Sequence, residues 1–290
     1  MVSFSGGQTS AFMCNFLLEN YSDQYEFFFV IANTGREHEE SLIFADKCDK
    51  HFGLNLVWLE CVTNPQHGIG PRHKIVSFET ASRNGEPFTA AIAKEGIPNT
   101  SRAYCTDRLK TQTIRSWMRE KGFIKRKVKT AIGMRADEPE RCKPDAPVVK
   151  RYHLVYPLAH WGQFDKQDVN DFWDFMPFCL QIPPLYGNCK TCFKKSDGKL
   201  YQIAQEQPDW FTWNIDMEKY ETVKADDGER HTWWRLKRDT RALLKEAGVA
   251  DPYMLSRRNS LEKDTPGGCG ESCDPFQFIP EDDELDDDEL

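Results

Sequence analysis

Residues 4–12 read "FSGGQTSAF" and join a short apolar run at 2–4 to a helical pattern of apolar residues that starts at Ala11. Two glycines and three hydroxyl residues between a strand and a helix place several backbone N–H groups around one point, at the positive end of the helix dipole. Such a loop binds phosphate, although a plain strand-to-helix turn with a Ser or Thr cap has the same composition. The stretch lacks the lysine and spacing of a Walker A loop and the G-x-G-x-x-G of dinucleotide folds.

Around this loop, short apolar runs alternate with amphipathic stretches, as in a parallel sheet with crossover helices. After a helix over 9–21 we expect a buried strand within 25–35, a helix over 38–53 closed by Gly53 and a strand within 54–62. Residues 63–85, rich in Pro, Gly, Asn and His, predict an irregular surface excursion. Helices are predicted over 86–96 and 105–122, and a strand over 128–134 leads into the charged turn 135–142. The fold class is therefore α/β, with a Rossmann-like parallel sheet.

After Lys150 the chain becomes aromatic-rich, and helices are predicted over 165–175, 197–207, 209–220 and 230–248. We expect an α/β domain over 1–150, a mostly helical region with a C-x-x-C motif over 151–255 and a C-terminal extension over 256–290. The last ten residues, "EDDELDDDEL", hold eight carboxylates, and the remaining chain has 38 basic and 38 acidic residues. Such a run predicts a solvated, disordered tail, with a nucleic-acid-mimicking lid as the alternative.

The chain has ten cysteines, of which Cys189 and Cys192 form a tight C-x-x-C pair. Two thiolates at this spacing can hold one metal ion or cluster from a single turn, and two further ligands must then come from elsewhere. We expect Cys105 to be one of these and Cys269 or Cys273 to be the other. Three interpretations remain open: a [4Fe-4S] cluster, a structural zinc ion, and a pair that is a redox dithiol or binds no metal.

Five segments resemble one family in the same order along the chain. Residues 5–10, "SGGQTS", resemble the S-G-G-x-[DT]-S pyrophosphate loop (PP-loop) of the adenine nucleotide alpha hydrolase superfamily, a HUP-type fold, with Thr9 where Asp is commoner. "ANTGREHEES" at 32–41 resembles the D-T-G-x-x-x-x-E-T segment of phosphoadenosine phosphosulfate reductases, with Asn33 in place of Asp. "YCTDRLKTQTI" at 104–114 resembles a segment shared by those reductases and the sulfur-insertion enzymes of DNA phosphorothioation. "IGMRADEPER" at 132–141 is similar to their G-x-R-x-x-E-x-x-R turn, and "YGNCKTCFKKS" at 186–196 to a cysteine motif of reductase-like phage proteins.

The resemblance implies that the ligand is ATP or an adenylyl-sulfate nucleotide, with Mg²⁺ between its phosphates. The residues that would bind the nucleotide are Ser5, Gly6, Gly7, Gln8, Thr9, Ser10, Asn33, Thr34, Gly35 and Arg141. The catalytic residues would be Cys105, Lys110, Arg135 and Glu138. Arginine suits phosphate because its planar fork donates paired, charge-assisted hydrogen bonds, and a helix N-terminus with cationic neighbours favours a thiolate at Cys105. A solvated turn with internal ion pairs and a buried structural cysteine are the simpler alternatives.

Three functions are consistent with these residues. The leading hypothesis is a PP-loop ATP pyrophosphatase or sulfurtransferase that adenylates a substrate oxygen, releases pyrophosphate and lets a sulfur nucleophile displace AMP. The first alternative is a thiol-dependent reductase of adenylyl-sulfate nucleotides, although Cys269 lacks the flanking Glu and His of the reductase tail. The second is a non-catalytic nucleotide-binding module stapled by zinc.

The expected partners are an adenine nucleotide, a sulfur or electron donor protein, and a second copy in a homodimer. The basic stretches at 121–129 and 233–245 add a nucleic acid to these partners, with a solvated basic surface as the simpler alternative. No apolar run reaches the roughly eighteen residues that span a bilayer, and the N-terminus has no secretion-signal pattern. We therefore expect a cytoplasmic protein without membrane contact.

Overall fold

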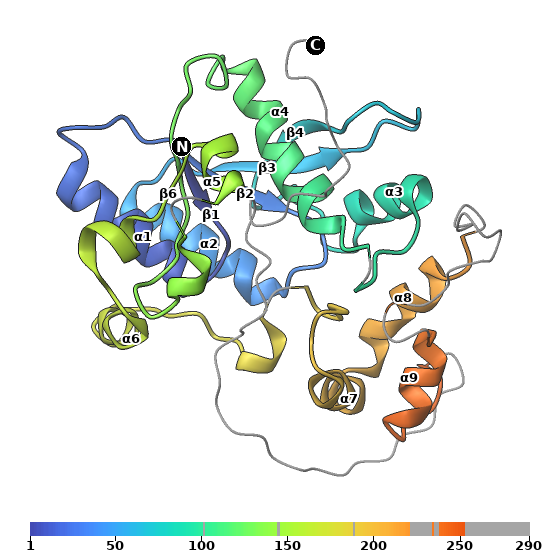
Figure 1. Cartoon of the computed structure of the whole chain (residues 1–290). Coiled ribbons are helices and arrows are strands. Elements are labelled where there is room, and N and C mark those ends of the chain that lie inside the picture. The colour runs from blue at the N-terminus through green and yellow to red at the C-terminus, as the bar shows by residue number, and fades with distance from the viewer. Residues whose placement is uncertain (101, 144–145, 188, 221–233, 235–237, 253–290) are drawn as a thin grey trace.

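The computed structural model describes residues 1–100, 102–143, 146–187, 189–220, 234 and 238–252 (Figure 1). Its centre is a six-stranded sheet with strand order β4-β3-β2-β1-β5-β6. The strands are β1 Val2–Phe4, β2 Phe29–Asn33, β3 Val57–Val62, β4 Arg72–Val76, β5 Thr130–Ala131 and β6 Leu154–Val155. All neighbouring strands are parallel except β4, which is antiparallel to β3. The predicted α/β class with a Rossmann-like sheet is confirmed.

Helices cover both faces of the sheet, because successive side chains of the central strand β2 point to opposite faces. Phe29 and Ile31 belong to a core shared with α1, α2 and α6, whereas Val30 and Ala32 belong to a core shared with α4 and α5. The α-helices of this body are α1 Gln8–Tyr21, α2 Glu39–Phe52, α3 Glu86–Glu95, α4 Gln112–Glu120, α5 Pro147–Tyr152 and α6 Lys166–Asp174. Two π-helical segments, η1 Asp107–Thr111 and η3 Leu158–Gly162, and the 3-10 turn η2 Pro139–Arg141 complete it. Within the described residues, no helix is both long enough and apolar enough to cross a bilayer.

Two strands lie where we expected none. The expected irregular stretch 63–85 contains β4, an edge strand whose side chains are mostly exposed, so the sequence shows no alternation of apolar and polar residues. The two-residue strand β6 lies in the stretch after Lys150, and it is too short to give a pattern of its own. Both strands are defined by their pairing with a neighbour, and pairing between distant segments is not visible in local sequence.

The α/β core continues past residue 150, the limit that we expected for the first domain. β6 pairs with β5, and Leu158, Val169 and Trp173 are buried in the same core as β1 and α1. Trp173 of α6 also donates from Nε1 to the carbonyl of Gln8, 3.1 Å away. The first part of the expected helical region therefore belongs to the layer that covers the sheet.

The remaining helices form a separate group at the lower right of Figure 1. They are α7 Asp197–Glu206, α8 Thr212–Met217 and α9 Thr240–Glu246, with 3-10 turns η4 Pro184–Tyr186 and η5 Pro208–Phe211. Their apolar faces enclose a core of their own, in which Leu200, Ile203, Ile215 and Leu244 are buried. The helix predicted over 230–248 is described only at its end, as α9, and the expected acidic tail lies outside the described residues.

The carboxylate of Glu218 holds α9 against the end of α8 and makes this docking sensitive to pH. It accepts hydrogen bonds from the Thr240 backbone N–H at 2.7 Å and from the Thr240 hydroxyl at 2.6 Å. Burial raises the pKa of Glu218 from 4.5 to about 7, although the bonds from Thr240 oppose this shift. Between these values the folded chain keeps a proton that the unfolded chain has lost, so stability falls as the pH rises through this window.

We expect Glu218→Gln to remove most of this pH dependence, which is on the order of 3 kcal/mol for a shift of this size. Thermal unfolding measured between pH 5 and pH 8 should give a flatter curve for the variant than for the unchanged chain. Glu19→Gln, at an exposed position on α1, is the control and should leave the slope unchanged. An identical slope in Glu218→Gln and in the unchanged chain would contradict this assignment.

Candidate functional site

The loop formed by residues 5–10, hereafter the glycine loop, joins β1 to α1 as the sequence predicts. Gly6 has φ +82°, a left-handed conformation that glycine adopts without strain, and Gly7 is the N-cap of α1. Ser10 organises the loop from inside, because its hydroxyl accepts from the Ser5 hydroxyl at 2.9 Å and donates to the Gly7 carbonyl at 2.9 Å. The first N–H groups of a helix have no partner within the helix, so this loop offers them to an anion.

The turn after β5 brings Arg135 to the glycine loop. The backbone passes so close that a Cβ on Gly133 would lie 3.1 Å from Ser10 Cα, so a larger residue there would push against the start of α1. Arg135 Nη1 then lies 3.5 Å from Thr9 Oγ1, its hydrogen-bond acceptor. The predicted residues Thr9 and Arg135, which are distant in sequence, therefore meet at one end of the sheet.

Carboxylates of the same turn hold the arginine side chains in place. Arg135 Nε donates to Asp137 at 2.8 Å, and the guanidinium groups of Arg135 and Arg141 both pair with Glu138. Arg135 holds the pKa of Asp137 below its usual value, although Asp137 is largely exposed to solvent. Here Glu138 orients two cations, and its predicted catalytic role stays a prediction.

The turn after β2 contains the predicted residues Asn33, Thr34 and Gly35. The side chain of Asn33 is buried, where it donates to Glu60 Oε1 at 2.7 Å and accepts from the Gly35 N–H at 3.1 Å. It thereby holds the turn, and direct contact with a nucleotide stays a prediction. Thr34 and Glu37 hydrogen bond with each other through the Thr34 hydroxyl, at 2.9 Å.

Glu60, inside β3, is a buried residue that belongs to none of the predicted motifs. Burial alone would raise its pKa, but hydrogen bonds from Lys74, Ser82 and Asn33 together hold the pKa below its usual value. Lys74 Nζ lies 2.8 Å from Glu60 Oε2. A charged residue inside the apolar stretch 54–62 was the available signal, because a carboxylate in a buried strand needs partners.

Three cysteines from distant segments line one small cavity, hereafter the thiol pocket. Cys105 lies at the start of the helix that η1 continues, and Cys189 and Cys192 belong to the C-x-x-C segment. The cavity has a volume of about 30 Å³ and is also lined by Thr34, Arg36, Lys110 and Trp213. The predicted convergence of Cys105 with the C-x-x-C pair is therefore present in the folded chain.

Contacts between the β2 turn and the C-x-x-C segment hold this pocket together. Glu37 and Cys189 form an isolated β-bridge, and the Lys190 N–H donates to the Arg36 carbonyl at 2.9 Å. The Thr34 hydroxyl lies 3.7 Å from Cys189 Sγ. The C-x-x-C segment is thus fastened to the carboxyl end of the sheet, where the glycine loop also lies.

Two cations line the thiol pocket. Lys110, on the π-helical segment η1, lies 3.8 Å from Glu37. Arg36 donates from Nη2 to the Trp210 carbonyl at 3.1 Å, and its Cζ lies 4.3 Å from the centre of the Trp213 ring. Burial lowers the pKa of Arg36 to about 10, while Cys189 and Glu37 act in the opposite direction. The guanidinium is therefore charged at neutral pH and places a positive charge in the wall of the pocket.

The predicted metal or cluster needs more ligands than this arrangement supplies. No three Cys, His, Asp or Glu side chains of the described residues are placed to hold one metal ion. The two further candidates, Cys269 and Cys273, lie outside the described residues. The three thiols share a pocket but, among the described residues, do not form a complete ligand set for a metal ion.

Comparisons with known proteins agree with this geometry. Residues 1–188 match the family described as "Phosphoadenosine phosphosulfate reductase domain". The chain is also similar to the "Uncharacterized nin region protein ORF290" of Escherichia phage lambda, with 30% identity over 286 residues, which cover 95% of this chain and 94% of that protein. No solved structure matches the chain. The glycine loop, the Arg135 turn and the match over most of the chain lead to one conclusion: this protein belongs to the phosphoadenosine phosphosulfate reductase domain family.

Proposed function

We propose that the protein is an enzyme that uses ATP to adenylate an oxygen of its substrate and then replaces that oxygen with sulfur. The observation that carries this proposal is the thiol pocket, in which Cys105, Cys189 and Cys192 come together beside the β2 turn. Because β1 and β2 are adjacent and parallel, the glycine loop and the β2 turn both lie at the carboxyl end of the sheet. Nucleotide binding and thiol chemistry can therefore act on one substrate.

The glycine loop would hold the phosphates of ATP. The N–H groups at the start of α1 face the anion, and Arg135 can donate a charge-assisted fork to it. Attack by the substrate oxygen on the α-phosphorus breaks the bond to the β-phosphate bridging oxygen, and pyrophosphate leaves. Arg135 would neutralise part of the charge that gathers on the leaving group. Mg²⁺ bound with the nucleotide would supply further positive charge.

The thiol pocket would supply the second step. The outer sulfur of a persulfide on one pocket cysteine attacks the carbon that bears the adenylated oxygen, the carbon–oxygen bond breaks, and AMP leaves with both bonding electrons. A second pocket cysteine then attacks the inner sulfur of the disulfide so formed, which frees the sulfur on the substrate and leaves a cysteine disulfide that an external thiol donor reduces. Arg36 and Lys110 favour an anionic group in the pocket. Burial disfavours the charged form of Arg36 and therefore costs folding free energy. A buried guanidinium in the pocket wall fits a role in binding an anion better than a role in stabilising the fold. The sulfur would come from a donor protein as a persulfide.

The test is to incubate the purified chain with ATP and candidate oxygen acceptors, and to measure pyrophosphate and AMP. We expect both products from the unchanged chain and neither from Gly6→Val, because Gly6 has φ +82° and valine is strained there. Cys105→Ser should still release pyrophosphate but should transfer no sulfur. Cys179→Ser, a cysteine outside the thiol pocket, is the matched control and should keep both steps.

The family description favours a second candidate, a thiol-dependent reductase of adenylyl-sulfate nucleotides. In that reaction a thiol attacks the sulfate sulfur and the adenine nucleotide leaves. A second thiol then attacks the thiol sulfur, which releases sulfite and forms a disulfide, without any pyrophosphate. Sulfite produced from phosphoadenylyl sulfate and a reduced thiol donor, with no pyrophosphate from ATP, would establish the reductase instead. Binding of ATP without either product would indicate a non-catalytic nucleotide-binding module. Iron, zinc and sulfide measured on the same preparation would show which metal, if any, the cysteines hold.

A further inference from the structure

A second cavity lies near the amino ends of the parallel strands, whereas the glycine loop lies at their carboxyl ends. It has a volume of about 150 Å³ and is bounded by α4, the start of β5 and the end of α5. The glycine loop follows the carboxyl end of β1, whereas Thr130 in this cavity begins β5, a strand parallel to β1. The two sites are therefore separated by the length of the strands.

Cationic side chains line this cavity. Arg115, Lys127, Arg151 and His153 contribute to its wall, and no carboxylate is among the described residues that do so. Arg115 is only 6% exposed, and its Cζ lies 4.9 Å from the centre of the Tyr152 ring. Arg151 also lies over this ring, at 5.7 Å. Positive charge held against an aromatic wall favours an anion with several acceptor oxygens.

A buried hydroxyl in the same wall has no partner. Thr130 is 1% exposed, lines the cavity, and its Oγ1 finds no hydrogen-bond partner among the described residues. An unpaired buried polar group costs about 1 to 3 kcal/mol, so natural proteins rarely keep one without a ligand or a water molecule to pair with it. A bound oxyanion would accept from this hydroxyl and from the arginines together.

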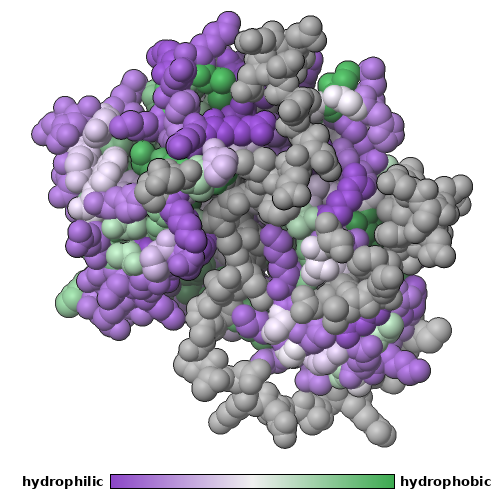
Figure 2. Space-filling model, in the orientation of Figure 1, coloured by the Kyte–Doolittle hydropathy of each residue, from purple (hydrophilic) through white to green (hydrophobic). Residues whose placement is uncertain are grey.

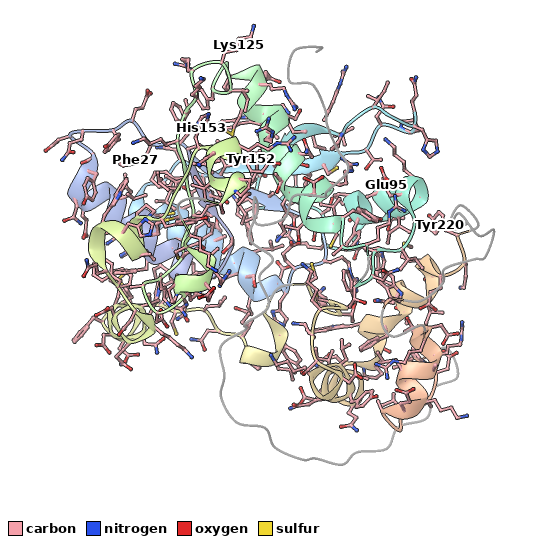
Figure 3. All side chains as sticks on the ribbon, in the orientation of Figure 1. Phe27, Glu95, Lys125, Tyr152, His153 and Tyr220 are labelled. Carbon is pink, nitrogen blue, oxygen red and sulfur yellow. The ribbon has the colours of Figure 1, made fainter. Side chains whose placement is uncertain are left out.

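The positive charge extends well beyond the cavity. Residues 119–129, "REKGFIKRKVK", carry six cations and one carboxylate, and the lysines of this stretch are exposed. None of Lys121, Lys125, Lys127 and Lys129 pairs with a described carboxylate. Lys125 lies at the outer end of the loop after α4, with Tyr152 and His153 beneath it (Figure 3). The surface over this part of the molecule is mostly hydrophilic, with a small hydrophobic group among the polar side chains (Figure 2).

We propose that this cavity is a second phosphate-binding site, which seats one phosphate of a nucleic-acid strand that runs over the 119–129 surface. The extent of the charge favours a strand over a free mononucleotide, because a single phosphate needs only the cavity. A strand carries one phosphate about every 3.4 Å and would use the surrounding lysines as well. This site is independent of the proposed function, since it lies at the amino ends of the strands and the glycine loop lies at their carboxyl ends.

The test is fluorescence anisotropy with the full chain and a labelled DNA single strand about twenty nucleotides long, at several salt concentrations. The double variant Lys127→Gln/Arg151→Gln should lower the affinity roughly tenfold to a hundredfold and reduce the salt slope by about two. Thr130→Val should lower it about fivefold through the lost hydrogen bond. This variant should fold normally, because the hydroxyl that it removes has no partner.

The matched control is Lys129→Gln, an exposed lysine of the same stretch that does not line the cavity. It should lower the affinity only about twofold, as for one peripheral phosphate contact. Cavity variants that bind as well as this control would overturn the proposal. Displacement of the strand by AMP or inorganic phosphate at the same phosphate concentration would also overturn it. Loss of strand binding in Gly6→Val would overturn it too, because the strand would then bind at the glycine loop.

Discussion

Replacing Gly35 with alanine is expected to lower the free energy of unfolding by about 2 to 5 kcal/mol. Gly35 has φ +77°, a conformation that strains any residue with a side chain by about 1 kcal/mol or more. A Cβ there would also lie 3.0 Å from both Cα and N of Gly85. These are backbone atoms that cannot turn aside, so the two segments must separate, and overpacking of this kind costs about 1 to 3 kcal/mol.

Urea unfolding of Gly35→Ala and of Gly122→Ala separates the two causes. Gly122 has a similar φ of +71° but nothing within 4 Å of the position a Cβ would take, so its substitution introduces strain without a clash. We expect the loss at Gly35 to exceed the loss at Gly122 by at least 1 kcal/mol. Equal losses would show that the approach of Gly85 does not constrain the turn.

The same substitution should disturb the site. Gly85 lies against Gly35 on one side, and on another a Cβ on it would meet Arg36 and Trp213 at 2.8 Å. Moving the β2 turn away from Gly85 therefore shifts the walls of the thiol pocket. The sulfur transfer that we propose for this pocket should fall further in Gly35→Ala than in Gly122→Ala, with both variants assayed well below their unfolding temperatures.

Replacing Arg135 with alanine is expected to lower the affinity for ATP about tenfold to a hundredfold. Arg135 is the cation that the fold places against Thr9 in the glycine loop. A hydrogen bond to a charged group contributes about 1.5 to 3 kcal/mol, which corresponds to this range of affinity. Arg135→Lys should recover only part of the loss, because an ammonium lacks the planar fork. Isothermal titration calorimetry gives the affinities directly.

Asp137→Asn provides the opposite change at the same site. Asp137 holds the Arg135 guanidinium at 2.8 Å, and an incoming phosphate must compete with this carboxylate. Removing its charge should leave ATP binding unchanged or strengthen it. Unfolding measurements should show little change in Asp137→Asn, because Asp137 is exposed. An Arg135→Ala variant that binds ATP as well as the unchanged chain would remove Arg135 from the nucleotide site.

Much of the fold was determined by local sequence. The apolar run at 2–4 predicts a strand, the small residues after it predict a loop, and the apolar periodicity that follows predicts a helix. The structure has all three. Gly53 closes α2 in a left-handed conformation, as predicted, because glycine adopts it without strain. These features depend on residues within one or two turns of each other, so they can be read without knowledge of the rest of the chain.

Only the tertiary structure decided which distant residues meet. Pairing with β3 makes a strand of the exposed segment Arg72–Val76, and packing against Gly85 explains why Gly35 must be glycine. Asn33 has the place of a ligand-binding residue in the motif, and only the folded chain shows that its side chain also donates to Glu60 from another strand. The cavity around Thr130 is made by three segments that share no motif. Local sequence determines the backbone preference of each segment. Contacts between distant segments depend instead on how the strands align in the sheet. That alignment places the glycine loop and the thiol pocket at the carboxyl end of the sheet.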